Sequence, residues 1–196
     1  MRNAVIERKT AETDIKIELN IDGTGSSSIS TGCGFLNHML TLFAKHGRFD
    51  LNVHCKGDVD VDYHHTVEDI GIALGQALKE CVGDGKGITR YADIVLPMDE
   101  ALILVAADVC GRSYLGFGLE LKADKVGDFD TELVNEFFAA LVGNFPISLH
   151  IKQLDGKNTH HIIEGAFKAV ARVLSSALSI NSLTAGEIPS TKGKLF

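Results

Sequence analysis

The sequence predicts a layered α/β protein made of two copies of one β-β-α-β-α unit, with sheets on one side, helices on the other and pseudo-twofold symmetry. Three matches between the two halves of the chain indicate this duplication. HHTVE at 64–68 recurs as HHIIE at 160–164, residues 35–53 align with 133–151, and ETDIKIELNIDG at 12–23 aligns with EALILVAADVCG at 100–111. The matches keep the same order in both halves, which favours a real duplication over chance.

In the first half, the hydrophobic pattern changes from strand-like to helix-like twice. Residues 13–21 alternate polar and apolar side chains, which predicts a half-buried strand. Residues 35–46 are predicted to form a helix, and 49–55 alternate again as a strand. Residues 64–81 place apolar side chains on one helical face, which predicts a second helix.

The second half repeats this order. We expect a strand at 100–109, a helix at 131–143 with Asp130 as its N-cap, a strand at 147–153 and a helix at 160–178. About ten additional residues precede the helix at 131–143, compared with the first half.

Two stretches rich in small residues are predicted to be loops, GSSS at 25–28 and VGDGKG at 82–87. The second of these is the natural boundary between the halves, so we assign 1–85 to the first half and 86–196 to the second half with a C-terminal tail. We expect the two halves to form one compact unit.

Composition excludes several classes of protein. The chain has 196 residues, of which 45% are hydrophobic, and a formal net charge of -7, which argues against a nucleic-acid binder. The N-terminus lacks the apolar region of a signal peptide, and no apolar run is long enough to span a membrane. Four scattered cysteines do not form a disulfide framework and are expected to be small buried side chains. We therefore expect a cytoplasmic protein.

The repeated HHxxE motif indicates a metal centre. A histidine and a glutamate about one helical turn apart share one helical face, so His64 with Glu68, and His160 or His161 with Glu164, can bind one ion together. Adjacent histidines point about 100° apart and can serve two ions. Eight candidate ligands result, four for each of two metals: His38, His64, His65, Glu68, Glu136, His160, His161 and Glu164. Imidazole and carboxylate ligands without thiolate favour Mn, Fe, Co, Ni or Zn.

A purely structural role is the main alternative for any single histidine. We favour that role for His54 and His150 on their predicted strands, and His46 at a helix end can complement the helix dipole. Two adjacent imidazoles repeated with a carboxylate one turn away have no comparable packing explanation.

Several longer motifs resemble the imidazoleglycerol-phosphate dehydratase family of histidine biosynthesis. They are GFLNHML at 34–40, HHTVEDIG at 64–71, KGITRYA at 86–92, PMDEAL at 97–102, DVCGRSYL at 108–115, HHIIEGAFKA at 160–169 and PSTKG at 189–193. The resemblance implies a manganese-dependent lyase that assembles as a homo-oligomer of 24 subunits with active sites between subunits.

The resemblance also implies roles for individual residues. One Mn²⁺ would be held by His38, His65, His160 and Glu164, and the other by His64, Glu68, Glu136 and His161. Substrate contacts would come from Glu12, His46, Arg90, Arg112, Lys168, Ser190 and Lys192. The sequence departs from the family pattern at Asn37, where Asp is frequent, at Glu136, where His is common, and at Gly165, where Ala is usual. Glu136 can still ligate a hard ion.

The implied reaction converts imidazole glycerol phosphate to imidazole acetol phosphate and water. The carbon that loses the proton has no adjacent carbonyl, so the imidazole ring must accept the electrons, and two Mn²⁺ ions can stabilise the imidazolate. The substrate phosphate requires cations, for which Arg90, Arg112 and Lys192 are candidates. A proton-transfer group is also required. Glu12 is the catalytic candidate, with Asp108 as the alternative.

Two other functions fit the same ligands. A dinuclear metallohydrolase acting on a phosphorylated small molecule would release inorganic phosphate and form no dehydrated product. A metal-assembled shell or metal-storage protein would dissociate on chelation and show no turnover. The basic residues that are expected near the site argue against this last reading, because assembly alone does not need them.

Overall fold

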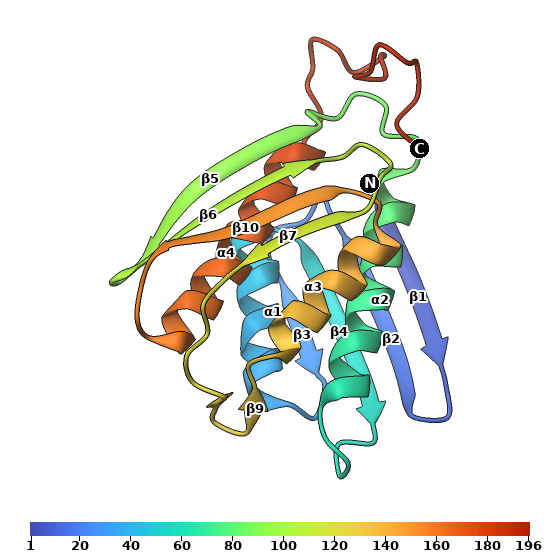
Figure 1. The fold of residues 1–196 in the computed structure, drawn as a ribbon. Coiled ribbons are helices and arrows are strands. Elements are labelled where there is room, and N and C mark those ends of the chain that lie inside the picture. Colours follow the sequence, from blue (N-terminus) through green and yellow to red (C-terminus); the bar gives the residue numbers. More distant parts are fainter.

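The computed structural model describes residues 1–196 and confirms the α/β fold class, with two four-stranded sheets and four long helices (Figure 1). The first half consists of β1 (Asn3–Lys9), β2 (Thr13–Asn20), β3 (Ser27–Ser30), α1 (Gly34–Gly47), β4 (Asp50–Gly57) and α2 (His64–Val82). The second half consists of β5 (Tyr91–Met98), β6 (Ala101–Asp108), β7 (Tyr114–Gly118), β8 (Lys125–Val126), β9 (Phe129–Asp130), α3 (Leu133–Asn144), β10 (Ser148–Asp155) and α4 (Thr159–Leu178).

The two sheets have the same topology. The strand order is β1-β2-β4-β3 in the first sheet and β5-β6-β10-β7 in the second. In each sheet the first three strands are antiparallel, and the last strand pairs parallel with its neighbour. This shared order is what an internal duplication produces.

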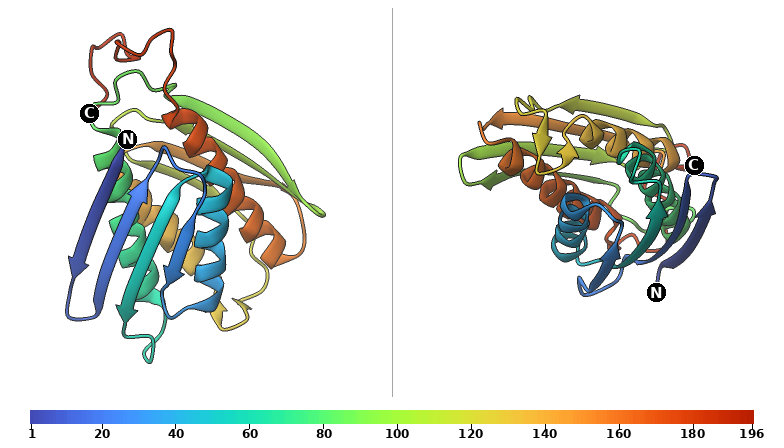
Figure 2. Two further views of the ribbon diagram at one scale, coloured as in Figure 1. Left: turned by 180° about the vertical axis from the view of Figure 1, so that it is seen from behind. Right: turned by 90° about the horizontal axis from the view of Figure 1, so that it is seen from below.

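The helices lie between the two sheets, which form the outer layers (Figure 2). Helix α2 packs on β1 and β2, and α4 packs on β5 and β6. Each helix of the first half packs against a helix of the second half, α1 against α4 and α2 against α3. Strand alternation explains this arrangement: Ile15, Ile17 and Leu19 of β2 face the helices and are at most 2% exposed. The inward residues of both halves belong to one continuous hydrophobic core.

Two local predictions were wrong. Residues 25–28 are only partly a loop, because Ser27 and Ser28 begin β3. Each of the two main sheets therefore has four strands, one more than the predicted β-β-α-β-α unit supplies, and the second half adds the short pair β8 and β9. The serine side chains of this edge strand are exposed and leave no hydrophobic alternation in the sequence. Helix α3 begins at Leu133 with Glu132 as its N-cap, instead of Asp130. Asp130 lies in β9 and pairs with Lys125 of β8, which keeps the chain extended there.

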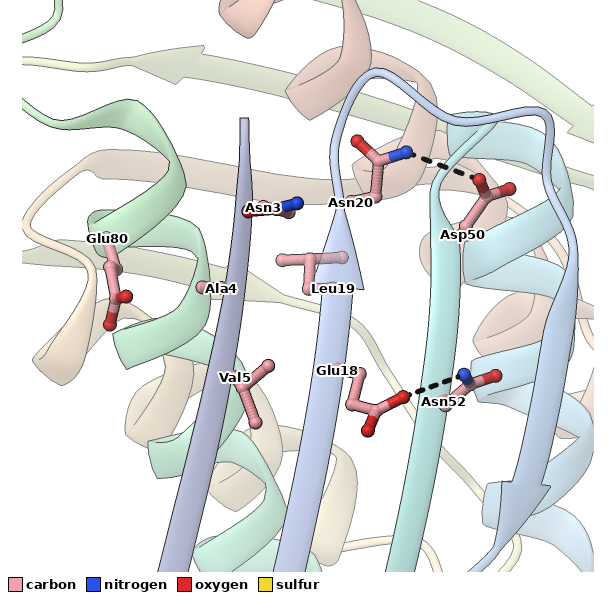
Figure 3. Close-up of a pocket in the computed structure, with 9 residues that line it drawn as sticks. All are labelled: Asn3, Ala4, Val5, Glu18, Leu19, Asn20, Asp50, Asn52 and Glu80. Atoms are coloured by element: carbon pink, nitrogen blue, oxygen red, sulfur yellow. Dashed lines mark hydrogen bonds between the residues drawn. The ribbon is translucent and has the colours of Figure 1, made fainter. Parts of the chain in front are cut away.

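The outer faces of the two sheets differ in character. The second sheet exposes Tyr91, Val95 and Tyr114, which are 56%, 49% and 56% accessible. The first sheet is polar, and a 510 Å³ depression on it is lined mainly by amides and carboxylates, with Asn20 bonded to Asp50 (Figure 3). No basic or imidazole side chain lines this depression, so it is a poor site for a phosphorylated substrate.

The four cysteines are buried and free, as expected for small apolar side chains. None of the helices combines the length and the apolar character that crossing a bilayer requires.

Candidate functional site

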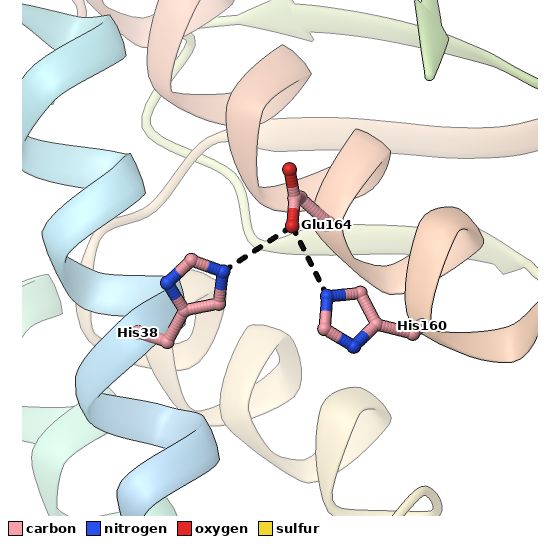
Figure 4. A group of neighbouring side chains, drawn as sticks. All are labelled: His38, His160 and Glu164. Atoms are coloured by element: carbon pink, nitrogen blue, oxygen red, sulfur yellow. Dashed lines mark hydrogen bonds and ion pairs between the residues drawn. The ribbon is translucent and has the colours of Figure 1, made fainter. Parts of the chain in front are cut away.

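Three of the predicted metal ligands meet where α1 packs against α4. His38 comes from α1, and His160 and Glu164 come from the first turns of α4 (Figure 4). The Glu164 Oε2 atom lies 3.3 Å from His38 Nε2 and 3.2 Å from His160 Nε2. The donor atoms of all three side chains lie within 4.8 Å of one another. Two imidazoles and one carboxylate in this arrangement suit a divalent transition metal.

The local sequence explains this geometry. Asn158 caps α4 by accepting a hydrogen bond from the His161 N–H, which fixes the start of the helix at the HH pair. The four-residue spacing then brings His160 and Glu164 onto one face. Phe35 of α1 packs edge-on against His160 with ring centroids 5.4 Å apart, so the imidazole rests against an apolar wall.

Glu164 is a buried carboxylate that remains charged. Its residue is 7% exposed. Burial raises its pKa, but hydrogen bonds from Lys168 and His160 outweigh that effect and hold the pKa below its usual range. The Lys168 Nζ atom donates to Glu164 Oε1 at 2.5 Å. A charged carboxylate aimed between two imidazole Nε2 atoms is the donor set that a cation needs.

The second histidine of each pair points away from the first. The rings of His160 and His161 are 6.1 Å apart and inclined by 82°, and those of His64 and His65 are 6.2 Å apart and inclined by 80°. The divergence expected from helical geometry is therefore present in both halves. Each pair can contribute one imidazole to each of two separate ions.

Carboxylates orient both of these second histidines. The His161 Nδ1 atom lies 2.7 Å from Glu100 Oε2, and His65 Nδ1 lies 2.9 Å from Asp58 Oδ2. These contacts raise the pKa of each imidazole, and the bond to His161 lowers the pKa of Glu100 to about 2. A carboxylate on Nδ1 leaves Nε2 free for a metal, as in many metal centres.

Glu12, the predicted catalytic residue, lies beside His65. Its Oε1 atom is 3.7 Å from His65 Nε2, and its side chain is 51% exposed. Glu12 and Glu100 occupy matched positions in the two halves, and each approaches the second histidine of the adjacent HH pair. The alternative base, Asp108, is instead held by Arg90, whose Nε atom donates to it at 2.9 Å.

The other three predicted ligands do not form a comparable cluster. His64, Glu68 and Glu136 are half-buried on the packed pair α2 and α3. Their donor atoms do not all come within 4.8 Å of one another, unlike those of the matched trio on α1 and α4. No hydrogen bond or ion pair joins the His64–Glu68 turn to the His160–Glu164 turn within the chain.

The residues expected to contact substrate fall into separate groups. Arg90, Arg112, Ser190 and Lys192 line one cavity of 440 Å³ near the C-terminal tail. There Arg90 has φ 76°, donates to the Pro189 carbonyl at 2.8 Å and stacks on Tyr91 at 4.5 Å. Neither His46 nor Lys168 lines that cavity: His46 is in the last turn of α1 near Arg172, and Lys168 of α4 bonds to Glu164. Burial, followed by Lys168 and Arg172, lowers the pKa of His46.

The cationic cavity and the imidazole cluster lie at opposite ends of α4. The Arg90 N–H donates to the Ala177 carbonyl in the last turn of the helix, whereas His160 is in its first turn. At 1.5 Å per residue this separation is about 25 Å. One chain alone therefore keeps the cationic cavity far from the imidazole cluster.

Sequence reasoning missed Asp58 as a site residue. It lies seven residues before His65, in the loop after β4, and nothing in its spacing marks it. Glu100 was visible only as the repeat partner of Glu12. Asp99, 3.7 Å from His161 Nε2, has φ 50°, a left-handed conformation that side chains rarely adopt.

Comparisons with known proteins agree on one family. The family model described as imidazoleglycerol-phosphate dehydratase matches residues 31–174. The chain is 56% identical to the imidazoleglycerol-phosphate dehydratase of Azorhizobium caulinodans, over 100% of this chain and 99% of that protein. It is 57% identical to that of Caldanaerobacter subterraneus subsp. tengcongensis, over the full length of both.

Two solved structures share the fold. The imidazoleglycerol-phosphate dehydratase from Staphylococcus aureus has a TM-score of 0.84 at 45% identity, covering 91% of this chain and 99% of that one. The enzyme from Pyrococcus furiosus, solved in complex with (S)-C348, has a TM-score of 0.82 at 37% identity, covering 96% and 99%. The chain therefore belongs to the imidazoleglycerol-phosphate dehydratase family, the dehydratases of histidine biosynthesis.

Proposed function

We propose that the chain converts imidazole glycerol phosphate to imidazole acetol phosphate and water at a site with two Mn²⁺ ions, shared between copies of the chain in the cytoplasm. The observation that carries this proposal is the distance of about 25 Å between the imidazole cluster and the cationic cavity. Only a few bonds separate the ring and the phosphate of the substrate, so one chain cannot bind both groups at once.

A second copy of the chain resolves this mismatch. The Arg90 and Arg112 cavity of one subunit would bind the phosphate of a substrate whose ring lies at the His38 and His160 cluster of another. The apolar outer face of the second sheet supplies a surface suited to such assembly. The proposed assembly is the 24-subunit homo-oligomer implied by the family resemblance.

The donor set supports a manganese centre. We assign His38, His65, His160 and Glu164 to one ion, and His64, Glu68, Glu136 and His161 to the other. The ions would supply Lewis acidity toward the substrate ring and the departing oxygen. The chain's own part is to present charged Glu164 between two imidazole Nε2 atoms, and to hold His65 and His161 by their Nδ1 atoms.

The remaining residues bind the substrate and transfer protons. Arg112 and Lys192 would neutralise the phosphate, and Lys168 and His46 would line the path between phosphate and metal. Glu12 would move a proton, because its exposed carboxylate lies next to a ligand histidine without a strong ion pair of its own.

Metal content measured together with turnover tests the two-metal account. Glu68→Ala is expected to lose one metal per chain and to lose turnover by orders of magnitude. Glu80→Ala, a change on the exposed far end of α2, is the matched control and should keep both. Near-normal turnover of Glu68→Ala would contradict the proposal.

Anomalous X-ray scattering from crystals with a substrate-like imidazole or triazole phosphonate tests the shared site. The proposal expects two ions per site and the phosphonate held by Arg90 and Arg112 of a neighbouring subunit. Release of inorganic phosphate without a dehydrated product would instead identify a metallohydrolase.

A further inference from the structure

The turn between β1 and β2 carries Glu12 beside the first turn of α2 (Figure 1). The Glu12 side chain is 51% exposed, and its Oε1 atom lies 3.7 Å from His65 Nε2, too far for a hydrogen bond. No direct bond to this imidazole therefore holds the carboxylate. Its position depends on the backbone of the turn.

The Thr10 hydroxyl fixes the backbone of this turn. The Thr10 Oγ1 atom accepts from the Glu12 N–H at 3.1 Å and from the Thr13 N–H at 2.9 Å. Threonine hydroxyls stabilise turns by bonds of this kind. Both lone pairs of the Thr10 hydroxyl are used in these bonds, so its one proton remains to be donated.

That proton enters a chain of hydrogen bonds, the Asp69 chain, which runs from Thr10 through Thr13 to Asp69 of α2. Asp69 is 6% exposed and accepts at both oxygens, from Arg8 Nη2 at 2.8 Å and from Thr13 Oγ1 at 2.5 Å. Because the Thr13 hydroxyl gives its single proton to Asp69, the 3.2 Å contact between the two hydroxyls must run from Thr10 to Thr13. The Asp69 carboxylate thus sets one direction for the whole chain.

The second half of the duplicated fold lacks the Asp69 chain. By the repeat alignment, the positions of Arg8, Thr10, Thr13 and Asp69 are occupied by Leu96, Met98, Ala101 and Gly165. None of these four residues carries a hydroxyl or a charge. The shared fold therefore does not require the chain, which is present only at the turn that carries Glu12.

Glu100, the repeat partner of Glu12, is held in a different way. Its Oε2 atom lies 2.7 Å from His161 Nδ1, and its Oε1 atom accepts from the Asn158 N–H at 2.7 Å. A carboxylate engaged at both oxygens can orient an imidazole but has little capacity left to accept a proton from substrate. Glu100 is therefore anchored by its carboxylate, whereas Glu12 is anchored through its backbone.

We propose that the members of the Asp69 chain are positioning residues that hold the Glu12 backbone and leave its carboxylate free for proton transfer. This inference rests on the proposed catalytic role of Glu12. Asp69 belongs to α2, so the chain ties the turn of Glu12 to the helix that carries the HH pair at its start. Such a tie matters because displacing a reacting group by about 1 Å can lower a rate by about a hundredfold.

Steady-state kinetics of the assembled, metal-loaded protein on imidazole glycerol phosphate test the proposal. Thr13→Val removes the central hydroxyl and nearly keeps the side-chain volume. It should lower kcat by about ten- to a hundredfold, with KM within about twofold of wild type and manganese content unchanged. Thr13→Ser keeps the hydroxyl and should restore kcat to within about threefold of wild type.

Hydrogen exchange at the Glu12 N–H, measured by mass spectrometry on the same protein, gives a readout that does not depend on turnover. Exchange should be about tenfold faster in Thr13→Val, because the Thr10 hydroxyl that accepts this N–H is no longer fixed. Thr13→Ser should exchange at the wild-type rate.

Thr131→Val is the matched control. Thr131 is 5% exposed, compared with 3% for Thr13, and its hydroxyl donates to the Ala123 carbonyl at 2.8 Å, outside the Asp69 chain. This variant should lose a buried hydrogen bond and keep kcat.

Wild-type kcat in Thr13→Val, with Glu12→Gln inactive, would overturn the proposal. So would a raised KM or a loss of manganese in Thr13→Val, because the chain would then have only a structural role. Near-normal turnover of Glu12→Gln would instead refute the proton-transfer role of Glu12, and the exchange rate would still decide whether the Asp69 chain holds the turn.

Discussion

The close approach of α2 and α3 depends on two glycines, and this contact also positions Glu68 and Glu136, which we propose as metal ligands. A Cβ on Gly71 would lie 2.7 Å from the Phe137 carbonyl oxygen and 2.9 Å from Ala140 Cβ. A Cβ on Gly75 would lie 2.5 Å from the Leu141 carbonyl oxygen. Backbone oxygens cannot rotate away, so Gly71→Ala must push the two helices apart.

The size of the effect follows from two opposing terms. Alanine is favoured over glycine inside a helix by about 1 kcal/mol. Overpacking a tight contact costs about 1–3 kcal/mol, and contact with backbone oxygen places Gly71→Ala in the upper part of that range. We expect a net loss of about 1–2 kcal/mol in the free energy of unfolding. Gly143→Ala is the matched control, because a Cβ there meets nothing within 4 Å. Gly143→Ala should raise the free energy of unfolding by about 0.5–1 kcal/mol.

Urea unfolding of the metal-free variants, followed by circular dichroism, measures this difference. Manganese titration then tests the functional consequence. Gly71 lies one turn after Glu68, and Phe137 follows Glu136, so separating the helices should weaken one of the two proposed metal sites and leave the proposed His38 site unchanged. Stability of Gly71→Ala equal to that of Gly143→Ala would refute the packing argument.

Three further outcomes are expected. Glu100→Gln should lower the pKa of His161 toward its ordinary value in nuclear magnetic resonance titrations of metal-free protein, because the carboxylate stabilises the imidazolium. Because the His161 pKa is raised, the stability that the His161–Glu100 pair contributes is lost as the pH rises through that raised value. Because the Glu100 pKa is lowered to about 2, the same contribution is also lost when the pH falls toward that value. Asp69→Ala should lower the free energy of unfolding by about 2 kcal/mol, because it leaves the Arg8 guanidinium, which donates to Asp69 at 2.8 Å, without its partner. The loss is smaller than for a fully buried ion pair because the Arg8 side chain is 31% exposed. Arg112→Ala should raise KM for the phosphorylated substrate at least about tenfold with unchanged metal content, and metal loss would mean that its role is misassigned.

Periodicity predicted the elements that bury a face and missed those that do not. The strand at β2 and the helix at α4 were readable because tertiary packing selects apolar residues at fixed intervals. The edge strand β3 buries few side chains, and β8 and β9 have only two residues each, so none of the three leaves a hydrophobic pattern in the sequence. The Asp130 cap failed because Asp130 pairs with Lys125 of β8 in a short hairpin, and this pairing overrides the capping preference.

In the candidate site, likewise, contacts within one helix could be predicted from the sequence and contacts made by loops could not. Helical spacing was sufficient to bring His160 and Glu164 together, because the two residues are one turn apart on a single helix. The contact between His65 and Asp58 depends on how the loop after β4 returns to α2, and no local spacing specifies that path. The proposed pairing of one chain's imidazole cluster with another chain's cationic cavity lies outside what local sequence can specify.

The duplication also explains why the two metal-ligand sets differ within a single chain. On α4, Lys168 lies one turn after Glu164 and balances its charge. The matched residue on α2 is Ile72, so Glu68 has no such partner, and Glu136 replaces the imidazole found at His38 with another anion. Two carboxylates without a neighbouring cation repel each other, whereas the trio on α1 and α4 is close to neutral with Lys168 in place. The α1 and α4 set therefore closes in this structure without an ion, and we expect the proposed α2 and α3 set to gather only when a cation supplies the missing charge.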